Sequence, residues 1–200
     1  MAADHAEVVR RAFADLRRFG ARVALVGGLA VSVHTRPRMT KDVDISVAVA
    51  GDAEAEQIVR ACLHAGYKHG AILEHESGRL ATVRLFVPES ASRGEPDVDL
   101  LFATCGIENE IVAGARVLKL GTLGTVPVAG VGHLIAMKLL SESKTRLQDR
   151  IDLQALIAVA SSSELDLAKA GANLIERRGF ARGKRLLDVL AGFLGPQHHA

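Results

Sequence analysis

The chain has 200 residues, of which 48% are hydrophobic and 24% charged, the balance expected of a globular protein with one sizeable core. Its formal net charge of +2 argues against a protein that grips duplex nucleic acid through phosphate contacts alone, and an aromatic content of 4% argues against a base-stacking platform for single strands. No apolar run reaches membrane-spanning length, no secretory segment is recognisable, and the two cysteines form no CxxC pair. We therefore expect a cytoplasmic protein with reduced thiols and no membrane partner.

Helical and extended patterns alternate in the first part of the chain. Apolar residues recur at helical spacing over residues 7–19, and a short apolar run over 23–26 predicts a buried strand that ends at Gly27-Gly28. A short helix over 29–34 is then broken at Arg36-Pro37-Arg38. Further on we expect strands over 43–49 and 98–102, a helix from Gly51 to Gly66, two strands joined near Glu76-Ser77-Gly78, a short helix over 107–113, and extended pieces over 117–128.

After Pro127 the hydrophobic pattern is helical throughout. The fold class predicted is therefore α/β (α+β), with a mixed sheet and flanking helices in residues 1–128 and a helical region in residues 129–196. Ser163 is a reasonable N-cap within that region. The four helices expected there cover residues 131–140, 147–160, 165–175 and 181–193. A basic run is expected to be a solvated helix face, and it consists of Arg177, Arg178, Arg182, Lys184 and Arg185.

Asp42 and Asp44 form the most informative pair of side chains. Residues two apart on a strand project to the same side, so both carboxylates point together while Val43 and Ile45 face the core. Two carboxylates that close repel each other unless a cation lies between them. Mg²⁺ suits the arrangement because proteins bind it through one or two carboxylates plus substrate phosphates.

Gly27-Gly28, at the end of a buried strand and the start of a helix, meets a complementary need. Glycine lets the backbone approach a ligand closely, and a helix N-terminus offers unpaired N–H groups to phosphate oxygens. Either motif alone is weak, since a glycine pair is commonly only a tight connection and an Asp-x-Asp pair only a surface pair or a helix cap. Together, and in this order, they indicate a bound nucleoside triphosphate whose Mg²⁺ is held by the carboxylates.

A third carboxylate is available in Pro96-Asp97-Val98-Asp99-Leu100. Asp99 is favoured over Asp97 because apolar residues flank it on both sides, although both share one strand face. If this strand lies beside the strand of Asp44, one of the two could complete a two-metal site.

These motifs resemble those of the nucleotidyltransferase superfamily with the DNA polymerase beta-like fold. The pattern of that superfamily is hG[GS], then Dh[DE], then h[DE]h, where h is a hydrophobic residue. Within this superfamily, the sequence from Arg36 through Asp44 looks most like that of AbiEii-type abortive-infection toxins and their MenT-like relatives. These are bacterial type IV toxin–antitoxin nucleotidyltransferases. The likeness continues in Lys138, Arg146, Asp149 and Asp152, and so covers about residues 22–156. The matching segments are Val26-Gly27-Gly28, Asp42-Val43-Asp44 and Val98-Asp99-Leu100.

The resemblance implies a catalytic domain over 1–128, with a cleft completed by 129–196, that moves a nucleotide from an NTP to a hydroxyl on tRNA or a protein. It implies Mg²⁺ as cofactor, with Mn²⁺ as the alternative ion, and a cognate antitoxin as a further partner. Asp42, Asp44 and Asp99 would be the catalytic and metal-binding residues. The nucleotide-binding positions would be Gly27, Gly28, Thr40, Lys41, Lys138 and Asp149.

Other interpretations of these residues stay open. Lys138 could be a surface lysine whose stem lies on apolar neighbours, and Asp149 and Asp152 could pair with Arg146 and Arg150 on a helix surface. The rival functions are a small-molecule nucleotidyltransferase acting on aminoglycoside or lincosamide antibiotics and a non-catalytic module that binds a partner. An acidic acceptor pocket would favour a drug, whereas a basic groove would favour tRNA.

Overall fold

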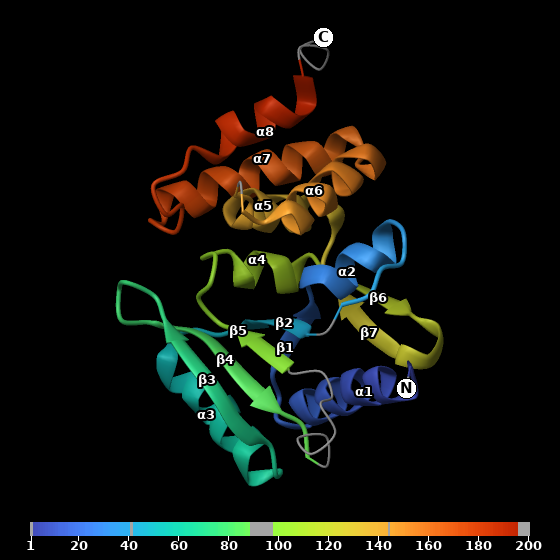
Figure 1. Cartoon of the computed structure of the whole chain (residues 1–200). Coiled ribbons are helices and arrows are strands. Elements are labelled where there is room, and N and C mark those ends of the chain that lie inside the picture. Colours follow the sequence, from blue (N-terminus) through green and yellow to red (C-terminus); the bar gives the residue numbers. More distant parts are fainter. Residues whose placement is uncertain (1, 41, 89–97, 144, 196–200) are drawn as a thin grey trace.

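A computed structural model describes residues 2–40, 42–88, 98–143 and 145–195, with side chains from residue 6 onward in the first of these ranges. Within these ranges, a seven-stranded mixed sheet is covered by helices on both faces, and a layer of helices from the last third of the chain lies beyond one face (Figure 1). The strands, in chain order, are β1 (Arg22–Leu25), β2 (Val43–Ala48), β3 (Lys68–Glu74), β4 (Leu80–Phe86), β5 (Val98–Leu101), β6 (Arg116–Lys119) and β7 (Thr125–Val128).

The order of the strands places three charged side chains side by side. Across the sheet the order is β3-β4-β5-β2-β1-β7-β6, so that β5 lies between β4 and β2. β2 and β5 run parallel with Asp44 opposite Asp99, and β4 runs antiparallel to β5 with Arg84 opposite Asp99. Along β4, buried Ala81, Val83 and Leu85 alternate with partly exposed residues, which is the period of a strand packed on one face. This period leaves Arg84 on the face that carries the carboxylates.

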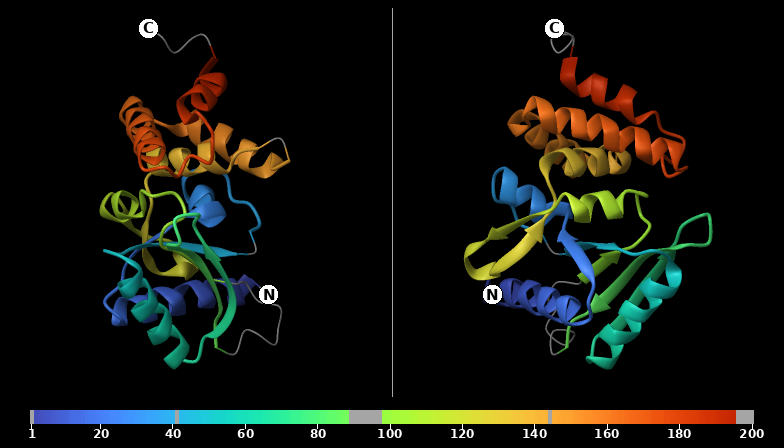
Figure 2. Two further views of the ribbon diagram at one scale, coloured as in Figure 1. Left: turned by 90° about the vertical axis from the view of Figure 1, so that its left-hand side faces the viewer. Right: turned by 180° about the vertical axis from the view of Figure 1, so that it is seen from behind.

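Helices close both faces of the sheet. α1 (Ala2–Arg18) and α3 (Asp52–His64) lie on one face, and α2 (Gly27–His34) and α4 (Glu108–Ala113) lie on the other, toward the helical layer (Figures 1 and 2). α1 holds its place because its apolar stripe, including Val9, Phe13 and Leu16, is buried against the sheet. Between β6 and β7 the chain makes a short 3₁₀ turn, η1 (Gly121–Leu123).

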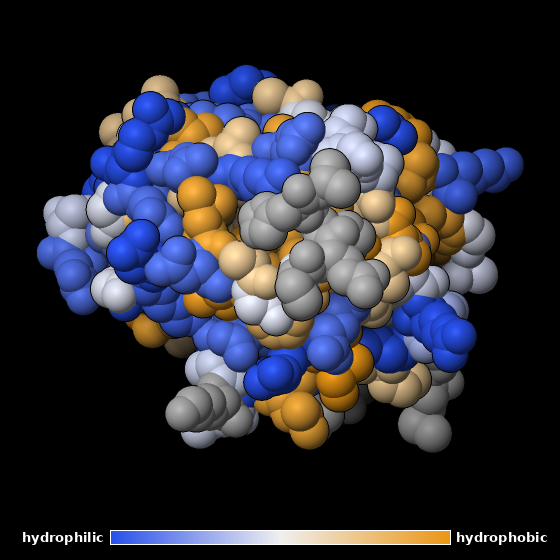
Figure 3. Space-filling view, turned by 90° about the horizontal axis from the view of Figure 1, so that it is seen from above, coloured by the Kyte–Doolittle hydropathy of each residue, from blue (hydrophilic) through white to orange (hydrophobic). Residues whose placement is uncertain are grey.

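The helical layer consists of α5 (Val131–Ser141), α6 (Leu147–Val159), α7 (Ser162–Arg177) and α8 (Leu186–Leu194). α5 is its most buried member, with Leu134, Ile135 and Leu139 almost inaccessible to solvent. Seen from above, hydrophilic residues cover much of this layer and hydrophobic residues appear in smaller patches (Figure 3). The layer contacts the sheet region through α2, which packs against both α5 and α6.

Three local expectations for the helical layer were wrong. The N-cap of α7 is Ser161 rather than Ser163, because Ser161 and Glu164 form a reciprocal capping box. α8 begins at Leu186 rather than residue 181, since positive φ angles at Arg182 and Gly183 interrupt the helical backbone. The basic run is therefore not one helix face, because Arg178, Arg182, Lys184 and Arg185 all lie outside α7 and α8.

The predicted α/β fold with a mixed sheet and a helical C-terminal part is confirmed. Its division at residues 128 and 129 stays a prediction. In the described part of the chain, no helix has the length and apolar character needed to cross a membrane.

Candidate active site

The centre of the site is a group of four charged side chains on β2, β4, β5 and the residue just before β2, which we call the sheet cluster: Asp42, Asp44, Arg84 and Asp99. The Arg84 guanidinium donates to both oxygens of Asp99, from Nε at 2.8 Å and from Nη2 at 2.7 Å. Arg84 Nη2 also lies 3.7 Å from Asp42 Oδ2. Arg84 thus makes its closest contacts in the cluster with Asp99. Among the described residues, none donates a hydrogen bond to the Asp44 carboxylate at these distances.

Asp44 is consequently the least compensated acid of the cluster. Burial, and then the neighbouring charges of Asp99 and Asp42, raise its pKa from 3.8 to about 6, while the more weakly felt charges of Lys138 and Arg84 lower it. A carboxylate held in this way is stabilised by any added cation. The arrangement therefore favours binding of a positively charged ligand at Asp44.

The glycine turn at the start of α2 lies directly against Asp44. Gly27 has φ +64°, and a Cβ built on it would lie 1.9 Å from Asp44 Oδ2, so a side chain there would collide with the carboxylate. The backbone N–H of Val26 donates to the Asp44 carbonyl at 2.9 Å, which fastens the turn to β2. No side chain caps α2 at its N-terminus, so its first N–H groups remain available to a ligand.

Gly28, the second residue of the turn, lies against the loop that precedes β2. A Cβ on Gly28 would lie 2.5 Å from the Arg38 guanidinium and 3.1 Å from the Thr40 hydroxyl. Thr40 itself donates to the Asp42 carbonyl at 3.4 Å. Thr40 thus lies against the glycine turn, and its role in nucleotide binding stays a prediction.

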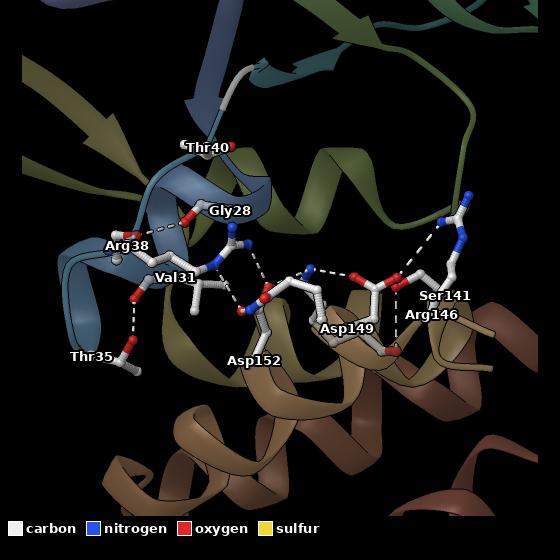
Figure 4. Close-up of polar contacts among 12 residues, drawn as sticks. Gly28, Val31, Thr35, Arg38, Thr40, Ser141, Arg146, Asp149 and Asp152 are labelled. Atoms are coloured by element: carbon white, nitrogen blue, oxygen red, sulfur yellow. Dashed lines mark hydrogen bonds and ion pairs between the residues drawn. The ribbon is translucent and has the colours of Figure 1, made fainter. Parts of the chain in front are cut away.

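A second charged group, the helix cluster, joins α5 and α6 to the loop after α2, and it consists of Arg38, Lys138, Gln148, Asp149 and Asp152. Asp152 is only 2% exposed and receives hydrogen bonds from Arg38 Nε at 2.9 Å, Arg38 Nη2 at 2.7 Å and Gln148 Nε2 at 2.8 Å. Lys138 Nζ lies 2.8 Å from Asp152 Oδ2 and 2.6 Å from Asp149 Oδ1. In Figure 4 these contacts form a chain from Arg38 through Asp152 and Asp149 to Arg146.

The charges of the helix cluster compensate one another. Burial raises the pKa of Asp152, but the hydrogen bonds from Arg38, Lys138 and Gln148 outweigh burial and leave the pKa below its usual value. Asp152 is therefore held ionised in a site where an unpaired charge would be costly. The interpretation of Asp149 and Asp152 as members of surface pairs is wrong for Asp152. The alternative that Lys138 is a surface lysine is also wrong, because its side chain is only 12% exposed.

A cavity of about 260 Å³ connects the two clusters. Its wall includes the glycine turn and Asp44 on one side and Lys138 and Asp149 on the other, so the structure brings five predicted site residues together in one cavity. Apolar side chains form its middle, and further cationic and polar groups complete it. These additional residues are Leu101, Thr104, Cys105, Leu134, Met137, Leu140, Ser141, Arg146 and Arg182.

The fit of this site to Mg²⁺ rests on Asp44 and Asp42. In the described part of the chain, no three His, Cys, Asp or Glu side chains stand together in a ready-made metal cluster, because Asp99 is turned toward Arg84. Asp44 has a raised pKa caused partly by Asp42, and oxygen ligands of this kind are what Mg²⁺ prefers. Two carboxylates plus phosphate oxygens of a substrate are sufficient for such an ion, so the residues present fit it.

Two positions named from the sequence, Lys41 and Asp97, lie outside the described residues. Asp99 lies on β5 directly beside Asp44, as expected if the third carboxylate is on a neighbouring strand. The sequence interpretation missed Arg84 and the role of Arg38. A single arginine in the otherwise alternating strand 80–86 was the available signal for Arg84, but its pairing with Asp99 depends on strand order.

Comparisons with known proteins identify a matching family. A family described as "Nucleotidyl transferase AbiEii toxin, Type IV TA system" matches residues 11–197. Searching the curated proteins gave no significant sequence match.

Several solved structures are similar to this chain, and those with a TM-score above 0.5 share its fold. An antigenic nucleotidyltransferase-like protein from Paracoccidioides brasiliensis is 17% identical with a TM-score of 0.52, and 88% of each chain is covered. ANT(2″)-Ia in complex with adenylyl-2″-tobramycin is 10% identical with a TM-score of 0.55, and the match covers 84% of this chain and 97% of that one. MenT4, a nucleotidyltransferase toxin from Mycobacterium tuberculosis, is 14% identical with a TM-score of 0.36, covering 96% of this chain and 95% of that one.

The family match spans nearly the whole chain. The chain belongs to the AbiEii nucleotidyltransferase toxin family of type IV toxin–antitoxin systems and is a nucleotidyltransferase.

Proposed function

We propose that the protein transfers a nucleoside monophosphate from a Mg²⁺-bound NTP to a hydroxyl group of tRNA, releasing pyrophosphate, and acts as the toxin of a toxin–antitoxin pair. One observation supports the proposal above all others: the glycine turn suited to phosphates and the under-compensated Asp44 carboxylate are in van der Waals proximity. A phosphate-bound cation is the ligand that satisfies both groups at once.

Each residue of the site has a proposed task. Gly27 and Gly28 would donate backbone N–H groups to phosphate oxygens at the start of α2, with Thr40 supporting that turn. Asp42 and Asp44 would hold Mg²⁺, with Mn²⁺ as the alternative ion. Lys41 is included from the sequence motif alone.

Asp99 would serve as the third carboxylate, either as a ligand of a second ion or as the base for the acceptor hydroxyl. Arg84 fixes its orientation through two hydrogen bonds, which leaves the remaining lone pairs of the carboxylate free to accept. Lys138 would face the triphosphate, and Asp149 would hold the ammonium group in place at 2.6 Å. Mg²⁺ bound at the site would supply Lewis-acid stabilisation of charge on the α-phosphate and the pyrophosphate.

The cations in the cavity wall favour tRNA as the acceptor. Lys138, Arg146 and Arg182 line the cavity, and its second acid, Asp149, is already paired with Lys138. An aminoglycoside is a polycation and would be repelled by such a wall, whereas a nucleic acid would be attracted. A protein acceptor is the other outcome of the experiment below. The two buried free cysteines support a reducing location, the cytoplasm, where NTPs and tRNA both occur.

The test is transfer of label from each of the four α-labelled NTPs, with Mg²⁺, to total tRNA, to a protein extract and to a panel of aminoglycosides. We expect labelled tRNA, and a loss of about 10³-fold in rate for Asp44→Ala, because a metal ligand contributes several kcal/mol to charge stabilisation. Gly27→Ala should lose a similar share of the transfer rate, since the new methyl group would occupy the space of the Asp44 carboxylate. Asp166→Ala, on the exposed face of α7, is the matched control and should retain full activity.

Labelling that survives Asp44→Ala would refute the site, and labelled drug or protein without labelled tRNA would refute the acceptor. The toxin role has a separate test, which is growth of cells that express the wild type or Asp44→Ala. Growth arrest by the wild type alone, relieved by co-expression of a gene adjacent to this one, is the expected result. Equal growth of both strains would contradict the role as a toxin.

A further inference from the structure

The segment between α7 and α8, residues 178–185, is fastened to the rim of the cavity, and we call it the α7–α8 loop. At its start the Arg178 guanidinium donates to the Gly106 carbonyl at 2.5 Å and pairs with Glu110 at 2.6 Å. Toward its end the Lys184 ammonium donates to the carbonyls of Leu140, at 2.7 Å, and Glu142. The loop thus spans from the sheet region to the end of α5.

An aromatic contact adds a third attachment. The Phe180 ring occupies the space beside Gly106, where any Cβ would lie 2.4 Å from the ring, and its centroid is 4.2 Å from that of His75. Gly106 has φ +75°, so both its backbone conformation and its lack of a side chain are needed for this packing. Arg178, Phe180 and Lys184 thus attach the loop to Gly106, to α4 and to the end of α5.

Arg182 lies between these anchors in an unfavourable backbone conformation. Its φ of +52° is the one positive φ of a residue other than glycine in the described part of the chain, and such residues cost about 1 kcal/mol or more. Its guanidinium donates to the Thr104 carbonyl at 3.2 Å and lines the same cavity as Asp44 and the glycine turn. Within the described residues no carboxylate forms an ion pair with it, whereas Arg178 is paired with Glu110 and Arg185 with Asp188.

The balance of charge in the cavity shows what Arg182 adds. Lys138 is already neutralised by Asp149 and Asp152, and Arg146 lies 3.6 Å from Asp149. Among the described cations of the cavity wall, Arg182 is therefore the one without a carboxylate partner. A guanidinium suits the oxygens of a phosphate group because it can donate two parallel hydrogen bonds.

We propose that Arg182 binds a phosphate group of the NTP, reaching the nucleotide from the helical layer while the glycine turn contacts it from the sheet. This inference rests on the proposed function and extends it, because it names a binding residue outside the motifs of the sheet and of α5 and α6.

The experiment measures calorimetric binding of inorganic tripolyphosphate in Mg²⁺ to the full-length protein. Arg182→Gly removes the guanidinium and makes the positive φ favourable, so the variant should fold at least as stably as the wild type. We expect its dissociation constant to rise about 10- to 100-fold, the effect of one charge-assisted hydrogen-bonding group. Arg185→Met, three positions away and paired with Asp188, is the control and should bind within about twofold of the wild type.

Arg182→Asn provides a second variant, because asparagine also tolerates a left-handed backbone, and it should lose the same affinity. Equal binding by the wild type and both Arg182 variants would overturn the inference while leaving the proposed function in place. Unchanged tripolyphosphate binding together with a raised KM for tRNA would also overturn it, by assigning Arg182 to the acceptor. A wild-type protein that binds neither tripolyphosphate nor NTP would instead refute the proposed function.

Discussion

The sheet cluster and the helix cluster contain the same kinds of side chains but balance their charges in opposite ways. In the sheet cluster Arg84 contacts Asp99 and Asp42, whereas no described residue donates a hydrogen bond to the carboxylate of Asp44, whose pKa rises to about 6. In the helix cluster Arg38, Lys138 and Gln148 all donate to Asp152, and its pKa falls below the usual value. The first cluster is short of positive charge and is suited to a bound cation, whereas the carboxylates of the second already have cationic partners.

This difference separates carboxylates suited to a metal ion from carboxylates that already have partners, without reference to any motif. Acidic residues in both clusters are close to the same cavity, and proximity alone would not distinguish them. The distinction lies in how many donors each carboxylate already has, because a satisfied buried ion pair resists change while an under-compensated one gains from a new cation.

The largest effect on stability should follow removal of the centre of the helix cluster. Asp152→Ala leaves Arg38 and Lys138 without their shared buried partner and should lower the free energy of unfolding by about 3–5 kcal/mol. Urea unfolding followed by circular dichroism measures it. Asp166→Ala, whose side chain is 73% exposed, should change the same quantity by no more than about 0.5 kcal/mol. Equal losses for the two variants would mean that the helix cluster does not hold the fold together.

Loss of an acid from the sheet cluster should raise the free energy of unfolding, whereas loss of Asp152 from the helix cluster should lower it. The folded-state pKa of Asp44 is about 6 against 3.8 ordinarily, so the native chain keeps a proton that the unfolded chain releases as pH rises between these values. Stability without metal therefore falls across that range, and the loss is complete above the folded-state pKa. Asp44→Asn avoids the loss and should be more stable near neutral pH by at most about 3 kcal/mol, with no gain in acid. Urea unfolding of both proteins at several pH values measures this gain, and an asparagine variant less stable at neutral pH would contradict the comparison.

Removing Arg84, the cation of the sheet cluster, should lower the free energy of unfolding moderately, and Mg²⁺ should reverse much of the loss. Arg84→Met leaves Asp99 and Asp42 uncompensated beside Asp44 and should cost about 1–2 kcal/mol, a value reduced because the Arg84 side chain is 37% exposed. Saturating Mg²⁺ should restore much of this loss by binding the native state. Thermal unfolding with Mg²⁺ and with a chelator provides the measurement. If Mg²⁺ stabilises neither the variant nor the wild type, the sheet cluster is not a site for this ion.

The smallest effect should come from the outer end of the helix cluster. Arg146 lies 3.6 Å from Asp149 but is 68% exposed, so Arg146→Met should alter the free energy of unfolding by less than about 0.5 kcal/mol. Urea unfolding under the conditions used for Asp152→Ala gives a direct comparison. A loss as large as that of Asp152→Ala would show that the exposed contact contributes as much as the buried ones.

Much of the fold was predictable because its causes are local. The period of two along residues 43–49 and the helical spacing of apolar residues over 7–19 predicted elements that the structure contains as β2 and α1. The start of α8 was harder to foresee. Residues 181–185 are expected from the sequence to be helical, but positive φ angles at Arg182 and Gly183 and the contacts of Arg178 and Lys184 keep the segment before Leu186 as a loop.

For the candidate site, the alternation of Asp42 and Asp44 and the glycine pair before them are local patterns, and these alone sufficed to indicate a cation and a phosphate. Tertiary structure decided which groups already have partners. Arg84 reaches Asp99 across 15 residues of sequence, and Arg38 reaches Asp152 across 114. Such pairs depend on strand order and helix packing, because hydrogen bonds form between atoms that are near in space, and local sequence patterns carry no information about which distant segments will meet.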